Sequence, residues 1–295
     1  MNQLNLQRVI PVGGQGVLTV GFSPDGGIVA AGSRDHLARA WSTATNDLLK
    51  TFTGHTEPVT ALAITPDGAT LATVSGDGNA ILWELASGTP QQRISVGSPL
   101  TYDGISPDGT QLATSDASGA RLWTLSGTSI RSFKTSNVNA IAFSPDGTLL
   151  ATVGDDGKAK LWRVDGGGAH QSIHVSSEPV NTVAFSPDGS AIATGGADGM
   201  VCRFTTKHGS LLSSYRAHDA AVTSVGYSHD GSVLASSSED QTINLCDSAS
   251  GTLLQTLTGH RASVTTFAFN SAPGVRASGF VLASGSLDDT VYLWG

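Results

Sequence analysis

The chain has 295 residues and a formal net charge of −8 at pH 7, with only 14% charged residues and 36 glycines. No block rich in lysine or arginine offsets the negative charge, so nucleic-acid binding is excluded as the main activity. The two cysteines, Cys202 and Cys246, lack metal-ligand spacing, and no apolar run approaches the roughly 20 residues of a membrane helix. We therefore expect neither a metal site nor a membrane contact.

The first predicted element is a strand over residues 4–10, which stands alone ahead of the first complete repeat. No charged segment followed by an apolar stretch precedes it, so no secretory signal is indicated and we expect a cytoplasmic protein. Beyond this strand one motif, Ser-Pro-Asp-Gly or a close variant, organises the chain at intervals of 38 to 42 residues. It occurs at 23–26, 65–68, 106–109, 144–147, 186–189 and 228–231, and in decayed form at 270–274. Such a period is typical of one supersecondary unit repeated along the chain.

The repeat at residues 54–96 shows the local structure that we expect of each unit. Three turn signals rich in proline, aspartate and glycine interrupt it. Proline presets φ for the first central position of a turn, aspartate tolerates the second, and glycine accepts a positive φ. The segments between the turns are short and apolar, which predicts a meander of four antiparallel strands. These predicted strands span 59–64, 70–74, 80–85 and 91–96.

The repeats must pack on one another, because a four-stranded meander with two apolar faces is marginal alone. In the first strand of most repeats small residues alternate with large ones, as Ala63 does with Leu62 and Ile64. The bulky face of one sheet can then pack on the small-residue face of the next, and a ring of such contacts leaves only short edges. The sequence therefore predicts an all-β, seven-bladed β-propeller with four antiparallel strands per blade.

A pattern of histidine, aspartate and tryptophan runs through the repeats and is clearest at His55, Asp77 and Trp83. The third-strand aromatic residue recurs in the other repeats, and Cys246 replaces it once. This pattern resembles the WD-repeat β-propellers over the whole chain, although the Trp-Asp dipeptide itself is absent. The resemblance implies a single domain over residues 1–295, with the N-terminal strand joining the last blade to close the ring.

The same resemblance gives the recurring polar residues a structural role. It implies a hydrogen-bonded tetrad within a blade, from imidazole to carboxylate, hydroxyl and indole N–H. A catalytic site is rarely repeated within one ring, so we prefer this role to a catalytic triad. The expected tetrads are His55, Thr73, Asp77 and Trp83; His260, Ser284, Asp288 and Trp294; and, without a tryptophan, His218, Ser236 and Asp240.

The third repeat departs most from the pattern. Asp103 stands where other repeats carry an apolar residue, and Ala117 stands where they carry the turn aspartate. A buried carboxylate is either paired or has a raised pKa. We expect a degenerate blade in which Asp103 finds a backbone or Ser/Thr partner; the alternative is an acid that contacts a ligand near the channel. The last repeat also has a longer hairpin loop at 271–280, either a grafted functional loop or a tolerated insertion.

Members of this family usually present partners to the face that bears the His and Asp loops, above the central channel. Matching the family's exposed positions gives two rings of candidate contact residues. The first ring precedes the turn aspartates and includes Arg34, Asp116, Asp155, Glu239 and Leu287. The second ring lies at the start of each first strand and includes Thr60, Thr101, Asn139, Asn181, Thr223 and Thr265. Neither ring holds a tryptophan or tyrosine, so we expect a polar, mildly acidic face that recruits a basic segment.

Three functions are compatible with these observations. The first is a non-enzymatic scaffold, expected as a monomer, whose loops recruit a protein or peptide. The second is a regulatory or sensor propeller within a larger bacterial signalling protein, such as a kinase or an NTPase. The third is a propeller enzyme. Because no nucleophile–base pair stands outside the repeat pattern, we expect no catalytic residues and no cofactor.

Overall fold

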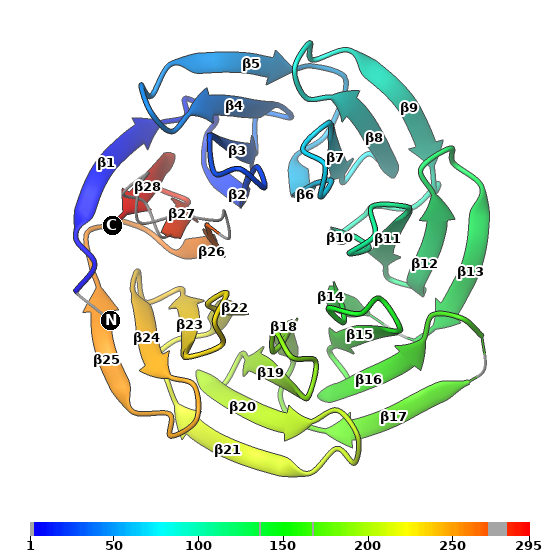
Figure 1. The fold of residues 1–295 in the computed structure, drawn as a ribbon, viewed down its shortest axis with the longest axis vertical. Helices are drawn as coiled ribbons and strands as arrows, with labels where there is room; N and C mark the ends of the chain where they lie inside the picture. Colours follow the sequence, from blue (N-terminus) through cyan, green and yellow to red (C-terminus); the bar gives the residue numbers. More distant parts are fainter. Residues whose placement is uncertain (1–2, 136, 167, 271–281) are drawn as a thin grey trace.

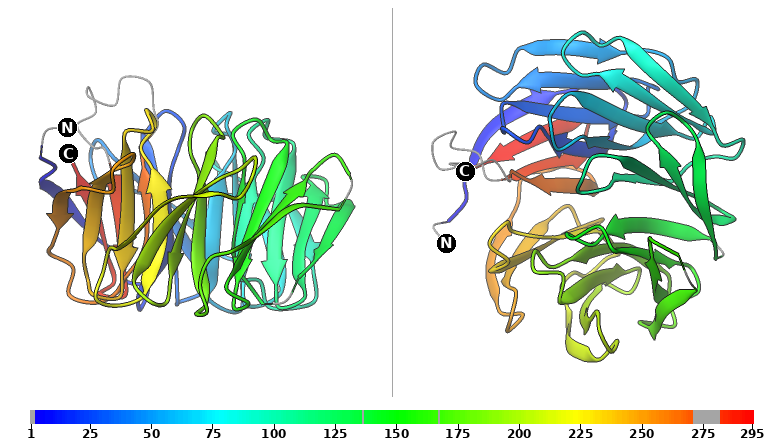
Figure 2. Two further views of the ribbon diagram at one scale, coloured as in Figure 1. Left: turned by 90° about the horizontal axis from the view of Figure 1, so that it is seen from below. Right: turned by 45° about the vertical axis from the view of Figure 1, so that its right-hand side comes forward.

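The computed structural model describes residues 3–135, 137–166, 168–270 and 282–295. Every regular element in these residues is a β-strand, and the strands form seven four-stranded antiparallel sheets that surround a centre as blades (Figure 1). From the side the blades form a flat disc, and the strands cross its thickness (Figure 2). The predicted all-β, seven-bladed propeller is confirmed. The long loop at 271–280 lies outside the described residues.

The first six blades each consist of four consecutive strands, with the first strand nearest the centre and the fourth on the outer rim (Figure 1). Blades 1 to 3 are β2 (Val17–Phe22), β3 (Ile28–Ser33), β4 (Ala38–Ser42) and β5 (Leu48–Phe52); β6 (Val59–Ile64), β7 (Thr70–Ser75), β8 (Asn79–Glu84) and β9 (Pro90–Ser95); and β10 (Tyr102–Ile105), β11 (Gln111–Asp116), β12 (Gly119–Thr124) and β13 (Ser129–Lys134). Blades 4 to 6 are β14 (Val138–Phe143), β15 (Leu149–Gly154), β16 (Lys158–Arg163) and β17 (Ala169–His174); β18 (Val180–Phe185), β19 (Ala191–Gly196), β20 (Met200–Thr205) and β21 (Leu211–Arg216); and β22 (Val222–Tyr227), β23 (Val233–Ser238), β24 (Ile243–Asp247) and β25 (Leu253–Leu257).

Blade 7 is assembled from two distant parts of the chain. Three of its strands are β26 (Val264–Phe269), β27 (Leu282–Ser286) and β28 (Thr290–Trp294). The fourth is β1 (Leu6–Pro11), which pairs antiparallel with β28, so the predicted closure by the N-terminal strand is confirmed (Figure 1). This strand begins two residues later than predicted. The backbone of Leu4 instead exchanges hydrogen bonds of 2.8 and 2.6 Å with the side chain of Gln255 in blade 6.

The Pro-Asp-Gly turns join the first and second strands of the blades, and their aspartates are held inside the turns. After β6 the Thr65 hydroxyl donates to Oδ1 of Asp67 at 2.5 Å, and the N–H of Ala69 donates to the same oxygen at 2.9 Å. Gly68 adopts a φ of 72°, which favours glycine. The Thr65 hydroxyl lowers the pKa of Asp67, since it hydrogen-bonds the charged form. Turn geometry thus accounts for these carboxylates.

Neighbouring blades pack large side chains onto small ones. A Cβ at Gly21 would lie 3.0 Å from Cδ1 of Leu62 in the next blade, and a Cβ at Gly226 would lie 3.1 Å from Phe267. Leu62 shares a buried cluster with Ala30 and other residues of blade 1. Full burial of a leucine-sized side chain stabilises a fold by about 1.5–3 kcal/mol. Each seam between blades is therefore a small hydrophobic core.

Candidate interaction surface

Blade 2 brings its four tetrad side chains together. His55 precedes β6, and its Nδ1 lies 3.0 Å from Oδ2 of Asp77 in the turn after β7. Its Nε2 lies 2.8 Å from Oγ1 of Thr73, which also accepts the indole N–H of Trp83 at 2.9 Å. Blade 7 repeats this arrangement, with corresponding distances of 3.0, 2.8 and 2.9 Å, in His260, Asp288, Ser284 and Trp294.

The protons of the tetrad follow from its chemistry. A carboxylate only accepts hydrogen bonds, so the Nδ1–H of His55 donates to Asp77. Nε2 then accepts the hydroxyl proton of Thr73. Burial lowers the pKa of His55 and of His260, although the adjacent carboxylates raise it. Both imidazoles are therefore neutral at pH 7, and their nitrogens are engaged in structural hydrogen bonds.

Blade 6 keeps three members of the tetrad. Nδ1 of His218 lies 2.9 Å from Oδ2 of Asp240, and its Nε2 lies 2.8 Å from Oγ of Ser236. The buried thiol of Cys246 occupies the position of the tryptophan. Burial raises the pKa of this thiol, which keeps it in the protonated and less reactive form.

In three blades without the histidine, a cation on the third strand faces the turn aspartate instead. The pairs are Arg39–Asp35 at 2.5 Å, Lys160–Asp156 at 2.7 Å and Arg121–Asp116 at 3.8 Å. Each cation stands two residues before the third-strand aromatic residue. In the blades that keep the histidine this position holds Ile81, Asn244 and Tyr292. We did not predict from the sequence that a cation replaces the histidine as the partner of the turn aspartate. The sequence does indicate it, because the basic residue at this position occurs only in repeats without the histidine.

Asp116 has no exposed side chain, so its expected place among the exposed contact residues is wrong. It is 2% exposed, and its carboxylate accepts hydroxyl groups of Ser98 and Ser118, each at 2.6 Å. The cause is a hairpin that is one residue shorter than in blade 2. The hydrogen-bonded pair Thr114 and Trp123 is nine residues apart in sequence, whereas Thr73 and Trp83 are ten apart. The shorter turn places Asp116 where the missing turn aspartate would lie.

The other named residues of the first ring remain at the surface. Arg34, Asp155 and Glu239 are exposed, and Leu287 is half-buried. Backbone hydrogen bonds tie their turns to the loop that precedes the first strand of the same blade. The N–H of Asp155 donates to Asn137 at 3.2 Å, and that of Glu239 donates to Ala221 at 3.1 Å. Turns and loops therefore lie together on the face of the disc that carries the tetrads.

The side chains of the second ring form hydrogen bonds between blades, which we did not predict from the sequence. Each of its named side chains donates to a backbone carbonyl at the start of the next blade, and we call this set the hydrogen-bond belt. Its bonds are Thr60 to Leu100 (3.0 Å), Thr101 to Val138 (3.1 Å), Asn139 to Val180 (3.1 Å), Asn181 to Val222 (2.9 Å), Thr223 to Val264, and Thr265 to Val17 (2.8 Å). Leu18 of blade 1 has no side-chain donor at this position. The belt thus joins six of the seven seams.

Asp103 lies on β10 opposite Thr114, and it does not find the partner that we expected. It is 5% exposed, and within the described residues neither carboxylate oxygen accepts a hydrogen bond. Burial raises the pKa of Asp103 to about 8. The expectation of a backbone or Ser/Thr partner is therefore wrong, because the carboxyl occupies a position that apolar side chains fill in other blades. The carboxyl is neutral over most of the physiological pH range.

The described residues contain neither a metal-binding cluster nor a membrane-spanning helix. No group of three or more His, Cys, Asp and Glu side chains in this part of the chain is placed to hold a metal ion. The same residues include no helix with the length and hydrophobicity that spanning a membrane requires. The polar side chains of interest are those on the face that carries the tetrads.

The seven repeated blades form a β-propeller, and in some of the blades a tetrad connects the loop before the first strand to the turn after the second. The chain belongs to the WD-repeat family. The model of the WD domain, G-beta repeat, matches residues 6–42, 46–84, 127–163, 169–204, 209–247 and 251–295. Residues 85–126 fall between two of these matches and include three strands of the divergent blade 3.

Several curated relatives resemble the chain over part of their length. One is the small ribosomal subunit protein RACK1y of Oryza sativa subsp. japonica, 26% identical over 52% of this chain and 49% of the relative. The target of rapamycin complex subunit wat1 of Schizosaccharomyces pombe is 31% identical over 48% of each chain. A guanine nucleotide-binding protein subunit beta of the same rice subspecies is 30% identical over 55% of this chain and 48% of its own. The chain thus spans about half the length of these relatives.

Proposed function

We propose that this chain is a non-enzymatic scaffold that recruits a protein partner through a basic segment, on the face that carries the tetrads. The observation that supports this most is the charge of the exposed residues there. Asp155 and Glu239 of the first ring are joined by exposed acids in the loops before β6, β18 and β22, namely Glu57, Glu178 and Asp219. The exposed bases of these loops and turns are Arg34 and Arg261, on blades 1 and 7.

The acids and bases of this face are unevenly distributed around the ring. In the loops and turns the acids lie on blades 2, 4, 5 and 6, whereas the two bases lie on the adjacent blades 7 and 1. The strands that flank these loops add exposed Lys134, Lys158 and Arg216, but exposed acids still outnumber exposed bases on blades 4 to 6. A basic segment is therefore attracted to the half of the face formed by blades 4 to 6. Complementary charge of this kind steers encounter and orients a partner more than it adds affinity.

The relatives support a protein as the partner, because their names place them in larger assemblies: a ribosomal subunit, a target of rapamycin complex and a guanine nucleotide-binding protein. The hydrogen bonds of the tetrads support the absence of catalysis. His55, His218 and His260 are buried and bonded to an aspartate and a hydroxyl of their own blade. They hold loops in place and have no free nitrogen for acid–base chemistry.

The test is binding of a fluorescent peptide of alternating glycine and arginine to the purified chain. The double variant Asp155→Asn, Glu239→Gln removes two charges and preserves shape, including the acceptor for the amide of Asn139 at 2.9 Å. We expect an affinity about threefold to tenfold lower, since an exposed ion pair contributes about 0.2–1 kcal/mol. Added salt should weaken binding to the original chain.

The matched control is Asp47→Asn, because Asp47 is an exposed acid in the hairpin between β4 and β5. This hairpin lies at the strand ends opposite to the tetrad face. An affinity that is unchanged in the double variant, or lowered equally by Asp47→Asn, would contradict the proposed surface.

A further inference from the structure

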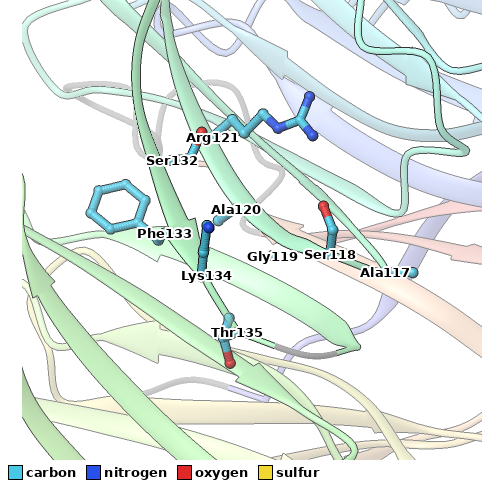
Figure 3. A pocket seen from close by; sticks show the side chains of 9 residues that line it. All are labelled: Ala117, Ser118, Gly119, Ala120, Arg121, Ser132, Phe133, Lys134 and Thr135. Atoms are coloured by element: carbon cyan, nitrogen blue, oxygen red, sulfur yellow. The ribbon is translucent and has the colours of Figure 1, made fainter.

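A pocket of about 490 Å³ lies on blade 3, at the end of the blade that belongs to the tetrad face. It is lined by the shortened turn after β11 and by the paired residues of β12 and β13 (Figure 3). Its polar side chains are Ser118, Arg121, Ser132, Lys134 and Thr135. None of the lining residues is acidic, and Asp116, 3.8 Å from Arg121, offsets only one of the two cations, so the pocket keeps a net positive charge.

Arg121 differs from the cations that hold the same position in blades 1 and 4. Arg39 and Lys160 make hydrogen bonds of 2.5 and 2.7 Å with their turn aspartates. Arg121 stays 3.8 Å from Asp116, because that carboxylate is already bound by Ser98 and Ser118. Its side chain is one-third exposed, at 33%. The N–H groups of this guanidinium therefore remain available to a ligand.

Lys134 adds a second available donor. It is exposed, and its ammonium group makes no ion pair or hydrogen bond with any residue that the structure describes. Its strand partner is Gly119, whose φ is 140° and whose Cβ, if present, would lie 2.1 Å from the carbonyl oxygen of Phe133. Glycine is required there, which leaves the pocket without a side chain between Arg121 and Lys134.

The rim of the pocket carries a third cation, whose charge is offset by an aspartate. Nζ of Lys160, from blade 4, donates a hydrogen bond to the Thr135 hydroxyl while it pairs with Asp156. Serine and threonine hydroxyl groups, a forked guanidinium and an ammonium group are the donors that bind carboxylate and phosphate oxygens in proteins.

We propose that this pocket binds an oxyanion carried on a protein segment, either the carboxylate of an acidic side chain or a phosphate ester. Arg121 supplies the forked pair of donors, Lys134 a compact charge, and Ser132 and Thr135 hydroxyl donors, since the Ser118 hydroxyl already donates to Asp116. Figure 3 shows these side chains around the paired ends of β12 and β13. The site prefers a ligand of the opposite charge to the basic segment proposed for the exposed acids of this face, and it does not depend on that proposal.

The proposal is tested by nuclear magnetic resonance titration of the isotope-labelled chain with three probes. These are inorganic phosphate, N-acetylphosphoserine amide and N-acetylglutamate amide. At least one of the two amino-acid probes should shift the backbone amides of Ser118, Gly119 and Lys134 in a saturable way. The stronger of the two identifies the source of the oxyanion.

Arg121→Gln should weaken this binding about tenfold, since a hydrogen bond to a charged group is lost. Arg39→Gln is the matched control, because it removes the cation at the same position of blade 1 and should leave the affinity unchanged. Lys134→Gln provides a second test at an exposed residue, where folding is not at risk, and it should also weaken binding. Saturation by inorganic phosphate alone, absence of saturable shifts, or unchanged affinity in both pocket variants would overturn the proposal.

Discussion

The hydroxyl of Thr265 donates a hydrogen bond of 2.8 Å to the backbone carbonyl of Val17. The donor lies on β26 of blade 7 and the acceptor on β2 of blade 1, so this bond crosses the seam between the last blade and the first. It belongs to the hydrogen-bond belt. The belt connects all the seams except the one between blades 1 and 2, where Leu18 has no side-chain donor. The belt holds the inner strands of adjacent blades together near the tetrad face.

Thr265→Val should lower the free energy of unfolding by about 1 kcal/mol, because the carbonyl of buried Val17 loses this donor while side-chain volume is kept. Leu18→Thr should raise this free energy by about 0.5 kcal/mol, because it supplies a donor at the one position that lacks it. Urea denaturation of both variants measures the two changes. Thr265→Ser keeps the donor and serves as control; equal stability of the valine and serine variants would show that the bond contributes nothing.

Asp103 should make the fold less stable as the pH rises. Its carboxyl titrates near its ordinary pKa of about 3.9 in the unfolded chain but only at about 8 in the fold. The folded state therefore binds the proton more tightly, and stability is lost as the pH rises from about 4 through 8. Asp103→Leu should remove this dependence and stabilise the chain at pH 8 by on the order of 2 kcal/mol.

Thermal unfolding of the Asp103→Leu variant at pH 5 and at pH 8 measures the effect. Asp47→Leu, at an exposed acid, is the control that should leave the pH dependence as it is. A leucine variant that is no more stable than the original chain at pH 8 would mean that the buried carboxylate is solvated or paired.

His55→Ala should destabilise the fold by about 1–3 kcal/mol, because the Thr73 hydroxyl and the Asp77 carboxylate each lose a partner in a buried site. His174→Ala removes an exposed imidazole from the outer strand β17 and should cost little. Denaturant midpoints separate the two variants. A scaffold should keep its partner affinity in His55→Ala at temperatures where the variant is folded, and a specific loss of binding would place His55 in the interaction surface.

Deletion of residues 1–10 should lower the melting temperature by on the order of 10 °C, because β28 loses its strand partner and buried Ile10 is removed. Calorimetry of the shortened chain measures this. A synthetic peptide of residues 1–14 should restore part of the loss when added in excess, since it binds only the folded state. A melting temperature that the deletion leaves unchanged would rule out β1 as the element that closes the ring.

The fold could be predicted because its determinants are local and repeated. Asp67 and Gly68 specify one turn by their own chemistry, and the alternation around Leu62 specifies which face packs on the next blade. Seven copies of such signals leave one architecture that buries every apolar face. The closing strand was also predictable, although its first residue was not. The binding of Leu4 by Gln255 depends on a contact between distant parts of the chain.

The site was less predictable, because its details depend on distances that the sequence does not contain. A single missing residue between Thr114 and Trp123 shifts Asp116 from the surface into the blade. Thr60 has the position of an exposed contact residue, but a carbonyl of the next blade lies within reach of its hydroxyl. The pairing of Arg39 with Asp35 is visible only when repeats with and without the histidine are compared. Asp103 lacks a partner because no donor of a neighbouring strand reaches it.

The pairing of β1 with β28 also sets the timing of folding during synthesis. Residues 6–11 leave the ribosome before the other strands of the ring, and residues 290–294 leave it after them. At ordinary translation rates, β28 is synthesised on the order of tens of seconds after β1. Blades 1 to 6 each consist of consecutive strands and can form during this interval, whereas blade 7 cannot. Until β28 emerges, the nascent propeller is therefore an open arc in which β1 has no strand partner.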